Sequence, residues 1–245
     1  MNKLGLLGKN ISYSFSKTYF KKKFEDEKID NTTYENFDID SINLLPSIIK
    51  NTQGLKGLNV TIPYKEQVIP FLDKLNKKAS AIGAVNTIKI TKKGKLVGYN
   101  TDCYGFKKSL KPALKSQHKK ALILGTGGAS KAIAYSLKEL DIAYSYVSRK
   151  ASKGIDFTYR TLSEDIVKEH QIIINCTPLG TFPNLSDCPD IPYKGITKNH
   201  ILFDLIYNPK ETLFLKKGKS SGAKTINGLN MLKFQAEKAW SIWNL

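Results

Sequence analysis

The segment ALILGTGGAS, residues 121–130, decides the fold, because four apolar residues run directly into a glycine-rich turn. An apolar run of this length and purity is typical of a strand buried on both faces of a parallel sheet. A helical pattern follows to about Leu140, and a second strand is predicted from Ala143 to Val147. The sequence therefore predicts the order strand, glycine turn, helix and strand.

The glycine turn has the spacing of a dinucleotide-binding loop. Gly125 and Gly127 occupy the first two glycine positions of a G-x-G-x-x-G motif, and Ser130 stands at the third. In such a loop the backbone amides approach a pyrophosphate, whose charge is stabilised at the amino end of the following helix. A plain tight turn could use the same residues, so the motif alone is weak. The strands and helix around it favour a Rossmann-type domain.

Basic residues follow the second predicted strand, at the position that reads the adenosine ribose. NAD enzymes place an acid there for the 2′-hydroxyl, whereas NADP enzymes place cations for a 2′-phosphate. This chain has Ser148, Arg149 and Lys150, with Lys153 just beyond. Because a guanidinium can bind phosphate through two parallel hydrogen bonds, NADP is predicted rather than NAD.

The chain before residue 90 alternates short β-rich and helical runs, which is typical of another α/β domain. After the glycine turn, further strands are predicted at residues 172–175, 201–206 and 223–226. A last helix, from about 229 to 243, has no obvious place in a doubly wound sheet, and we expect it to pack back on the first domain.

The predicted architecture is thus α/β throughout, with two domains. An N-terminal α/β domain for substrate binding and catalysis is expected over residues 1–101, completed by about 227–245. A Rossmann-type, doubly wound NADP-binding domain is expected over residues 102–226.

Composition limits the class of protein. The 245 residues are 41% hydrophobic and 24% charged, as in globular proteins, and no apolar run approaches the length of a membrane span. The three cysteines are odd in number and lack C-x-x-C spacing, which predicts free thiols in a reducing compartment. We therefore expect a cytoplasmic protein without a disulfide framework or a metal site.

A formal net charge of +18 is compatible with nucleic-acid binding, because lysine and arginine clusters contact phosphates. The lysines, however, lie in doublets and triplets along the whole chain, and most such lysines are solvated. Their field would also attract a polyanionic cofactor and an acidic substrate. We expect small-molecule partners, neither nucleic acid nor a membrane, and a monomer or homodimer.

Carbonyl reduction by hydride transfer needs a proton donor, usually His, Tyr or Lys. His118, His170 and His200 lie in polar or loop-like contexts with no acid at an orienting spacing, so surface positions are expected for them. Three Tyr-x-x-x-Lys patterns like that of short-chain dehydrogenases precede the glycine turn, where chance explains them in so lysine-rich a chain. They are Tyr13/Lys17, Tyr19/Lys23 and Tyr104/Lys108.

The remaining proton-donor candidate is Lys65. It follows a predicted strand that ends in polar residues, so Thr61 and Lys65 are expected together at the edge of a sheet. A second polar cluster, Asn100-Thr101-Asp102, lies at the expected domain boundary.

Eight motifs, in order, resemble those of the shikimate dehydrogenase family along nearly the whole chain. One of them alone could arise by chance, but eight in the family's order are very specific. They are Ser14-Phe15-Ser16, NVTIPYK (59–65), GAVNT (83–87), Asn100-Thr101-Asp102, GTGGAS (125–130), NCTPLG (175–180), DLIYNP (204–209) and the stretch from Gly228 to Gln235.

The resemblance implies a reversible, NADPH-dependent reduction of 3-dehydroshikimate to shikimate, in aromatic amino-acid biosynthesis. It implies Lys65 and Asp102 as the catalytic pair, and hydrogen bonds from Ser14 and Ser16 to the substrate carboxylate. The other substrate-binding residues that it implies are Thr61, Asn86, Tyr207 and Gln235. The implied NADP-binding residues are Gly125, Thr126, Gly127, Gly128, Ala129, Ser130, Ser148, Arg149, Lys150, Lys153, Thr177, Leu205, Gly228 and Met231.

Four positions depart from the family's pattern. Asn10 and Lys17 stand where proline is frequent, and Tyr13 stands where histidine or serine is frequent, so the loop around the two serines is in question. Ser148 replaces a frequent asparagine, which puts part of the ribose contact in question.

Two alternatives remain open. One is a quinate/shikimate dehydrogenase-like paralogue with broader substrate or NAD use, against which Arg149 and Lys150 argue. The other is a non-catalytic NADP-binding protein, against which the pair Lys65 and Asp102 argues.

Overall fold

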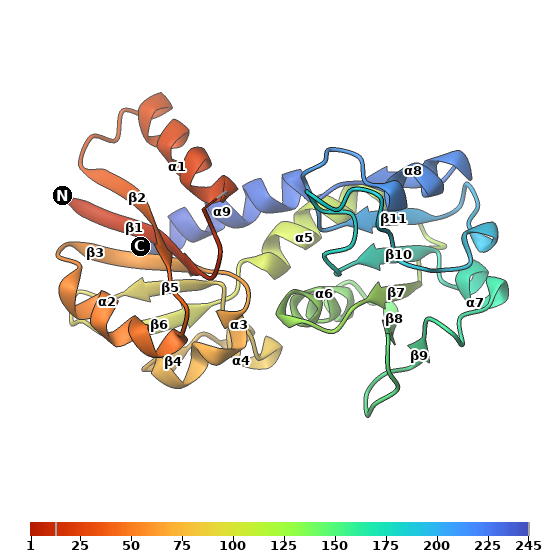
Figure 1. The fold of residues 1–245 in the computed structure, drawn as a ribbon, viewed down its shortest axis with the longest axis horizontal. Helices are drawn as coiled ribbons and strands as arrows, with labels where there is room; N and C mark the ends of the chain where they lie inside the picture. Colours follow the sequence, from red (N-terminus) through yellow and green to blue (C-terminus); the bar gives the residue numbers. More distant parts are fainter. Residues whose placement is uncertain (13, 245) are drawn as a thin grey trace. The chain divides into compact units, whose positions relative to one another are not determined.

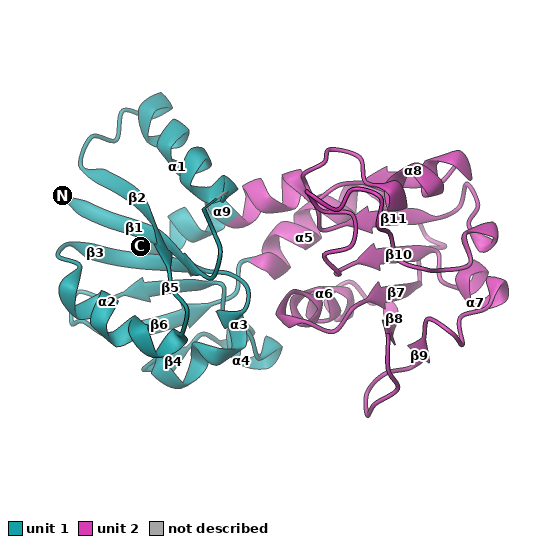
Figure 2. Ribbon diagram, viewed as in Figure 1, with its two compact units in different colours: residues 1–101, 236–245 teal, residues 102–235 magenta. Residues whose placement is uncertain are grey.

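The computed structural model describes residues 1–12 and 14–244. The chain forms two compact units (Figure 2): unit 1 contains Met1–Thr101 and the chain from Ala236 onward, and unit 2 is Asp102–Gln235. Tyr13, one of the Tyr-x-x-x-Lys tyrosines, lies outside the described residues. Of the helices in the described part of the chain, none is long and apolar enough to cross a membrane.

Unit 1 is built on a six-stranded mixed sheet of order β2-β1-β3-β5-β6-β4. β1 runs parallel to β2 and β3, whereas β5 is antiparallel to β3 and β6. The strands are β1 (Asn2–Gly8), β2 (Thr32–Asp38), β3 (Leu55–Val60), β4 (Lys74–Leu75), β5 (Thr87–Ile90) and β6 (Leu96–Tyr99). The helices of unit 1 are α1 (Phe15–Asp26), α2 (Leu45–Asn51), α3 (Tyr64–Gln67), α4 (Lys77–Ile82) and the end of α9 (Leu229–Trp243).

Both faces of this sheet are covered, as the alternation along β1 requires. Leu4 and Leu6 pack with side chains of α1 and the end of α9, whereas Leu7 packs with side chains of α2, α3 and α4. Figure 1 shows α1 and α9 on one side of the unit 1 sheet and α2, α3 and α4 on the other. The end of the last helix therefore packs on the first unit, and this prediction is confirmed.

Unit 2 contains a six-stranded sheet of order β12-β11-β10-β7-β8-β9, in which every neighbouring pair is parallel. The strands are β7 (Lys120–Leu124), β8 (Ala143–Ser148), β9 (Phe157–Thr158), β10 (Ile172–Asn175), β11 (Ile201–Asp204) and β12 (Lys224–Ile226). The chain begins this sheet at β7, proceeds outward to β9, and then returns to β10 on the other side of β7. The predicted doubly wound Rossmann-type architecture is confirmed.

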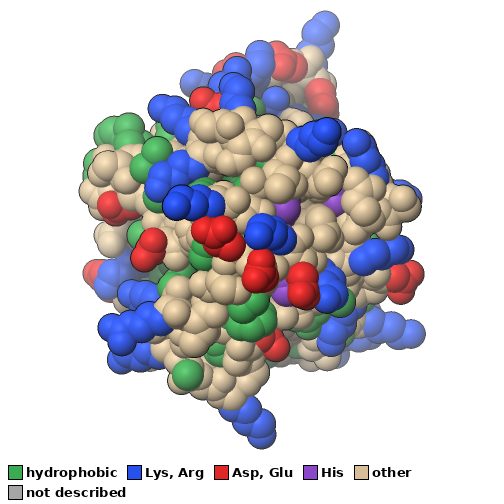
Figure 3. All heavy atoms as spheres, turned by 90° about the vertical axis from the view of Figure 1, so that its right-hand side faces the viewer, with side chains coloured by type: hydrophobic (Ala, Val, Ile, Leu, Met, Phe, Trp, Pro, Cys, Tyr) green, Lys and Arg blue, Asp and Glu red, His purple; other side chains and the backbone are tan. Residues whose placement is uncertain are grey.

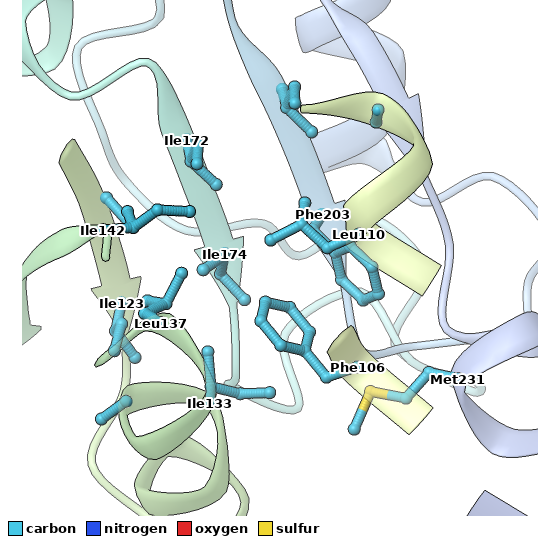
Figure 4. Close-up of a cluster of buried hydrophobic side chains, with 14 residues drawn as sticks. Phe106, Leu110, Ile123, Ile133, Leu137, Ile142, Ile172, Ile174, Phe203 and Met231 are labelled. Atoms are coloured by element: carbon cyan, nitrogen blue, oxygen red, sulfur yellow. The ribbon is translucent and has the colours of Figure 1, made fainter. Parts of the chain in front are cut away.

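Helices cover both faces of the unit 2 sheet. These helices are α5 (Asp102–Leu110), α6 (Gly128–Lys138), α7 (Glu164–Glu169) and α8 (Leu213–Ser220). Alternate residues of the central strands face opposite cores: Ile123 and Ile174 pack with α5 and α6 (Figure 4), whereas Ile173 packs with α7 and α8. The apolar run at residues 121–124 is completely buried, as its purity predicted.

Helices α5, α7 and α8 were not predicted. In α5 the sequence DCYGFKKSL has only a short apolar stripe, and Gly105 lies in its middle, which lowers intrinsic helix propensity. Tertiary contacts offset this cost, because a Cβ at Gly105 would lie 2.4 Å from the carbonyl oxygen of Met231. The glycine is therefore required for the close packing of α5 against α9 within unit 2.

The connection between β8 and β9 contains no helix, although the two strands are parallel. Parallel neighbours are usually joined by a helical crossover. Here residues 149–156 form a loop, which Asp156 ties to the edge of the sheet: its carboxylate accepts from the Tyr146 amide at 2.7 Å, and its own amide donates to the Tyr146 carbonyl at 3.2 Å.

The expectation that the three histidines lie at the surface is wrong. His118, His170 and His200 are buried, and each forms hydrogen bonds with backbone atoms of the protein. His200, for example, joins the Thr197 amide at 3.1 Å to the Val167 carbonyl at 3.0 Å. A polar sequence context did not reveal burial, because the partners of these rings are backbone groups. All three cysteines are free, as predicted.

Candidate active site

The predicted cofactor-binding residues gather at one edge of the unit 2 sheet. In a parallel sheet all carboxyl ends meet at the same edge, and ligands bind there, where the strand order reverses. The reversal lies between β7 and β10. The predicted residues at or just after these strand ends are Gly125 to Ser130 (β7), Ser148 to Lys153 (β8), Thr177 (β10), Leu205 (β11) and Gly228 (β12).

The turn after β7 has the geometry that a pyrophosphate needs. Gly125 has a φ of +101°, which favours glycine, and a Cβ there would lie 3.1 Å from the Thr177 side chain. A Cβ at Gly127 would meet nothing within 4 Å, and Gly127, the N-cap residue of α6, provides no side-chain cap. Open space therefore lies in front of a helix amino end, and these residues fit the diphosphate of NADP.

Ser130 replaces the third glycine without loss of the turn. It is completely buried, and its hydroxyl donates to the Gly127 carbonyl at 2.7 Å. The third glycine normally allows close helix–strand packing, and a serine is the smallest side chain that can fill this space and satisfy its own polar group. The Ser130 hydroxyl is thus used inside the turn.

The cations after β8 have no acidic partners. Arg149, Lys150 and Lys153 are exposed, and among the described residues no carboxylate forms an ion pair with them. On the face of the molecule shown in Figure 3, basic and acidic side chains are interspersed. The loop 149–156 therefore carries positive charge that fits a 2′-phosphate.

Tyr159 lies beside this loop, and sequence reasoning missed it. Its amide donates to the Ser148 carbonyl at 3.2 Å, but its buried hydroxyl has no hydrogen-bond partner within the described chain. Burial raises the pKa of this tyrosine to about 12, opposed by the positive charge of Arg149. This hydroxyl is thus an unsatisfied polar group near Arg149, and its burial keeps it out of reach of a ligand.

Thr177 is held by a buried polar network. Its amide and hydroxyl both donate to Asn175 Oδ1, at 3.0 and 2.6 Å. Asn175 Nδ2 donates to Asp204 Oδ1 at 3.0 Å, and the Thr212 hydroxyl donates to Asp204 Oδ2 at 2.6 Å. Asn175, Asp204 and Thr212 are at most 1% exposed. Each belongs to a motif or lies near one, but nothing in the sequence indicated that they meet.

Burial raises the pKa of Asp204 from 3.8 to about 6, although the hydrogen bonds from Thr212, Ile206 and Asn175 oppose the shift. The native protein thus holds this proton more tightly than the unfolded chain, so stability falls as pH rises from about 4 to 6. The expected cost of ionisation is about 3 kcal/mol.

This cost can be measured by urea unfolding of the parent protein and Asp204→Asn at pH 4 and pH 7. Because the unfolded chain is already partly ionised at pH 4, the difference in unfolding free energy between the two proteins should shift by about 2 kcal/mol in favour of the variant at pH 7. Contributions from the histidines cancel in this difference. A difference that does not change with pH would contradict the raised pKa.

Three further cofactor candidates, Leu205, Gly228 and Met231, follow later in the chain. A Cβ at Gly228 would lie 2.0 Å from the Leu205 carbonyl oxygen, so these two predicted residues are in backbone contact and only glycine fits. Met231 is 7% exposed and packs beside Phe106 in the core of unit 2 (Figure 4).

In unit 1, three of the predicted substrate-binding residues, Ser14, Ser16 and Asn86, lie in or beside a polar network. Ser14 caps α1 by accepting from the Ser16 amide at 3.2 Å, and the Ser16 side chain lies near the Tyr34 hydroxyl. The Tyr34 hydroxyl donates to Asn59 Oδ1 at 2.8 Å, and Asn59 Nδ2 donates to the Asn86 carbonyl at 3.3 Å. Tyr34 and Asn59 were not predicted, because they are linked to a predicted substrate-binding residue through a backbone group, by the hydrogen bond from Asn59 to the Asn86 carbonyl.

Backbone pairing places Thr61, Lys65 and Asn86 close together. The Val60 amide donates to the Asn86 carbonyl at 2.8 Å, and the Val85 amide donates to the Lys65 carbonyl at 2.7 Å. The Asn86 side chain is bound at both ends by Thr101, since its Oδ1 accepts from the Thr101 amide at 2.7 Å and its Nδ2 donates to Oγ1 at 3.0 Å. Thr101 directly precedes Asp102 in the chain.

Asp102 and Gln235 lie on neighbouring helices of unit 2. Asp102 begins α5 and is 6% exposed, and a carboxylate at a helix amino end is favoured by the helix dipole. One turn later, a Cβ at Gly105 would lie 3.2 Å from Cβ of Gln235 on α9. Tyr207 is half-buried and follows β11.

The loop before Ser14 explains one departure from the family pattern. Asn10 has a φ of +56°, and its amide donates to Asp38 Oδ1 at 2.8 Å. Proline could provide neither this φ nor the donor, whereas asparagine tolerates the left-handed region. The same carboxylate accepts from the Ile11 amide at 3.0 Å, so Asp38 holds this loop through two hydrogen bonds.

Within the described residues, no group of three or more His, Cys, Asp or Glu side chains could hold a metal ion.

Residues 6–88 match the family model of the shikimate dehydrogenase substrate binding domain. The NADP(+) shikimate dehydrogenase of Methanococcus vannielii is 40% identical over 260 aligned positions, which cover 98% of this chain and 90% of that protein. The chain belongs to the shikimate dehydrogenase family.

Solved structures agree with this membership. The shikimate 5-dehydrogenase of Thermus thermophilus, in complex with NADP(H) and shikimate, is 29% identical, with a TM-score of 0.87 over 99% of this chain and 93% of that chain. The quinate dehydrogenase of Corynebacterium glutamicum, in complex with NAD, is 26% identical, with a TM-score of 0.86 over 99% of this chain and 93% of that chain. The shikimate dehydrogenase fold is thus shared with a protein of different substrate and cofactor.

Proposed function

We propose that this chain catalyses the reversible, NADPH-dependent reduction of 3-dehydroshikimate to shikimate. The observation that carries the proposal is the carboxyl edge of the unit 2 sheet, where an open glycine turn and three exposed cations that pair with no carboxylate of the described residues fit NADP. Membership of a family whose relative with 40% identity is an NADP(+) shikimate dehydrogenase supports the same substrate.

The cofactor-binding residues divide by the part of NADP that they fit. Gly125 to Ser130 would receive the diphosphate, and Ser148, Arg149, Lys150 and Lys153 the 2′-phosphorylated ribose. Thr177, Leu205, Gly228 and Met231 would surround the nicotinamide. NADPH supplies a hydride to the ketone carbon when it is bound.

The substrate-binding residues are proposed on chemical grounds. The hydroxyls of Ser14 and Ser16 can donate to a carboxylate without a buried cation, and the excess positive charge provides long-range attraction. Thr61, Asn86, Tyr207 and Gln235 offer hydroxyl and amide groups for the ring hydroxyls. Unit 1, with the end of the chain, is proposed as the substrate domain, and unit 2 as the NADP domain.

Lys65 is proposed as the proton donor, paired with Asp102. As the ketone accepts hydride, its oxygen becomes an alkoxide, and the Lys65 ammonium would transfer a proton to that oxygen. In the direction of shikimate oxidation the neutral amine would take the hydroxyl proton back. Asp102 would orient the ammonium and compensate its charge.

The test mixes purified protein with shikimate and NADP⁺ and measures NADPH formation through the near-ultraviolet absorbance of NADPH. We expect absorbance to rise with shikimate and NADP⁺, and much more slowly when NAD⁺ replaces NADP⁺ or quinate replaces shikimate. Equal rates with quinate or NAD⁺ would favour the broader paralogue. No reaction with any pair, despite NADP⁺ binding in calorimetry, would favour the non-catalytic binding protein.

A further inference from the structure

One buried carboxylate holds two loops at the cofactor edge of unit 2. Asp204 is the last residue of β11, and its Oδ1 accepts from Asn175 Nδ2 and from the Ile206 amide, each at 3.0 Å. Its Oδ2 accepts from the Thr212 hydroxyl at 2.6 Å. Asp204 therefore contacts the end of β10, the loop after β11 and the residue before α8.

The same hydrogen bonds reach two proposed nicotinamide-side residues. Asn175 Oδ1 accepts from both the amide and the hydroxyl of Thr177, so Asp204 orients the amide that orients Thr177. The Ile206 amide adjoins Leu205, whose own amide donates to the Asn175 carbonyl at 3.1 Å. Loss of the carboxylate would release the loops after β10 and β11 together.

Burial of the Asp204 carboxylate in the core costs desolvation free energy. Asp204 is completely buried, its three hydrogen-bond donors are all neutral, and no lysine, arginine or histidine forms an ion pair with it within the described chain. Neutral or apolar residues often fill such a position at lower cost. A polar network of this kind rigidifies its surroundings when it is fully satisfied, and precise sites are built on such support.

We propose that Asp204 is a positioning residue for the cofactor, which fixes the loops after β10 and β11 in the conformation that receives the nicotinamide half of NADP. The role rests on the proposed function, because it assumes that NADP binds at this edge. The residue does not itself touch the cofactor, so its effect should fall on NADP binding and not on shikimate binding.

The experiment compares Asp204→Ala, Asp204→Asn and a control, Val167→Ala, which removes apolar contacts in the same unit at a fully buried position without touching the carboxylate. Asparagine keeps the Oδ1 acceptor for Asn175 and the Ile206 amide, and its amide can donate to the Thr212 hydroxyl. We expect Asp204→Ala to raise the NADP⁺ dissociation constant about tenfold, as for loss of one charge-assisted hydrogen bond, and Asp204→Asn to restore most of the affinity. The KM for shikimate should change little in either variant.

Hydrogen exchange without cofactor provides a readout that does not depend on the proposed function. Amides of residues 176–181 and 205–209 should exchange faster together in Asp204→Ala, and near the parent rate in Asp204→Asn. The proposal fails if Asp204→Ala binds NADP⁺ like the parent, or if Val167→Ala weakens binding equally at a matched loss of thermal stability. If the parent itself does not bind NADP⁺, the proposed function fails, whereas the exchange result still decides whether Asp204 holds both loops.

Discussion

Replacement of Lys65 with alanine is expected to lower the turnover number for shikimate oxidation by about 10²- to 10⁴-fold, the usual contribution of a positioned proton donor. The Lys65 carbonyl bond to Val85 is a backbone contact and survives the change, so Thr61 and Asn86 should stay in place. Affinity for NADP⁺ should change little, since the proposed cofactor residues all belong to unit 2. Steady-state kinetics and calorimetric titration with NADP⁺ measure the two quantities separately.

The matched control is Lys56→Ala, which removes an exposed lysine from β3 in the same unit. It lowers the net charge equally, so a loss caused only by weaker attraction of the acidic substrate would be seen in both variants. If Lys65→Ala turns over as fast as the control, Lys65 is not the proton donor.

The double variant Arg149→Ala/Lys150→Ala is expected to change cofactor preference. A hydrogen bond to a charged group contributes about 1.5–3 kcal/mol, so losing two such contacts should lower kcat/KM for NADP⁺ about 100-fold or more. NAD⁺ lacks the 2′-phosphate, and kcat/KM for NAD⁺ should remain near that of the parent. The ratio of the two constants, measured with saturating shikimate, tests the assignment.

A second double variant, Lys194→Ala/Lys216→Ala, removes the same charge from other exposed positions of unit 2. It should leave the NADP⁺ to NAD⁺ ratio unchanged. A parallel fall for both cofactors in the Arg149/Lys150 variant would mean that these cations act on the diphosphate or on stability, and that another group recognises the 2′-phosphate.

Sequence reasoning located the parts of the site that depend on local patterns. The apolar run before Gly125 predicted a buried parallel strand, and in such a sheet the strand ends must share an edge, so the meeting of Gly125 with Thr177 followed from topology. The resemblance placed Lys65 and Asn86 in motifs, and the structure shows that the backbone pairs their segments.

Other features could not be predicted, because they depend on contacts between residues distant in sequence. Asn175 and Asp204 are 29 positions apart, and Tyr34 and Asn59 are 25 apart. Buried His118 and His200 form hydrogen bonds with carbonyl groups of residues distant in sequence, and any residue type can provide a carbonyl. The unsatisfied hydroxyl of Tyr159 could not be predicted either, because no sequence pattern indicates that a hydroxyl lacks a hydrogen-bond partner.

The direct loop from β8 to β9 has an evolutionary consequence. The residues proposed to discriminate between the two nicotinamide cofactors occupy a segment that buries little apolar surface and contains no regular secondary structure. Substitutions there incur little packing penalty, so the adaptive route between NADP and NAD use is short and nearly neutral for stability. Selection could thus change the preference of this enzyme for NADP or NAD through substitutions in one surface loop. The rest of the protein would need no change.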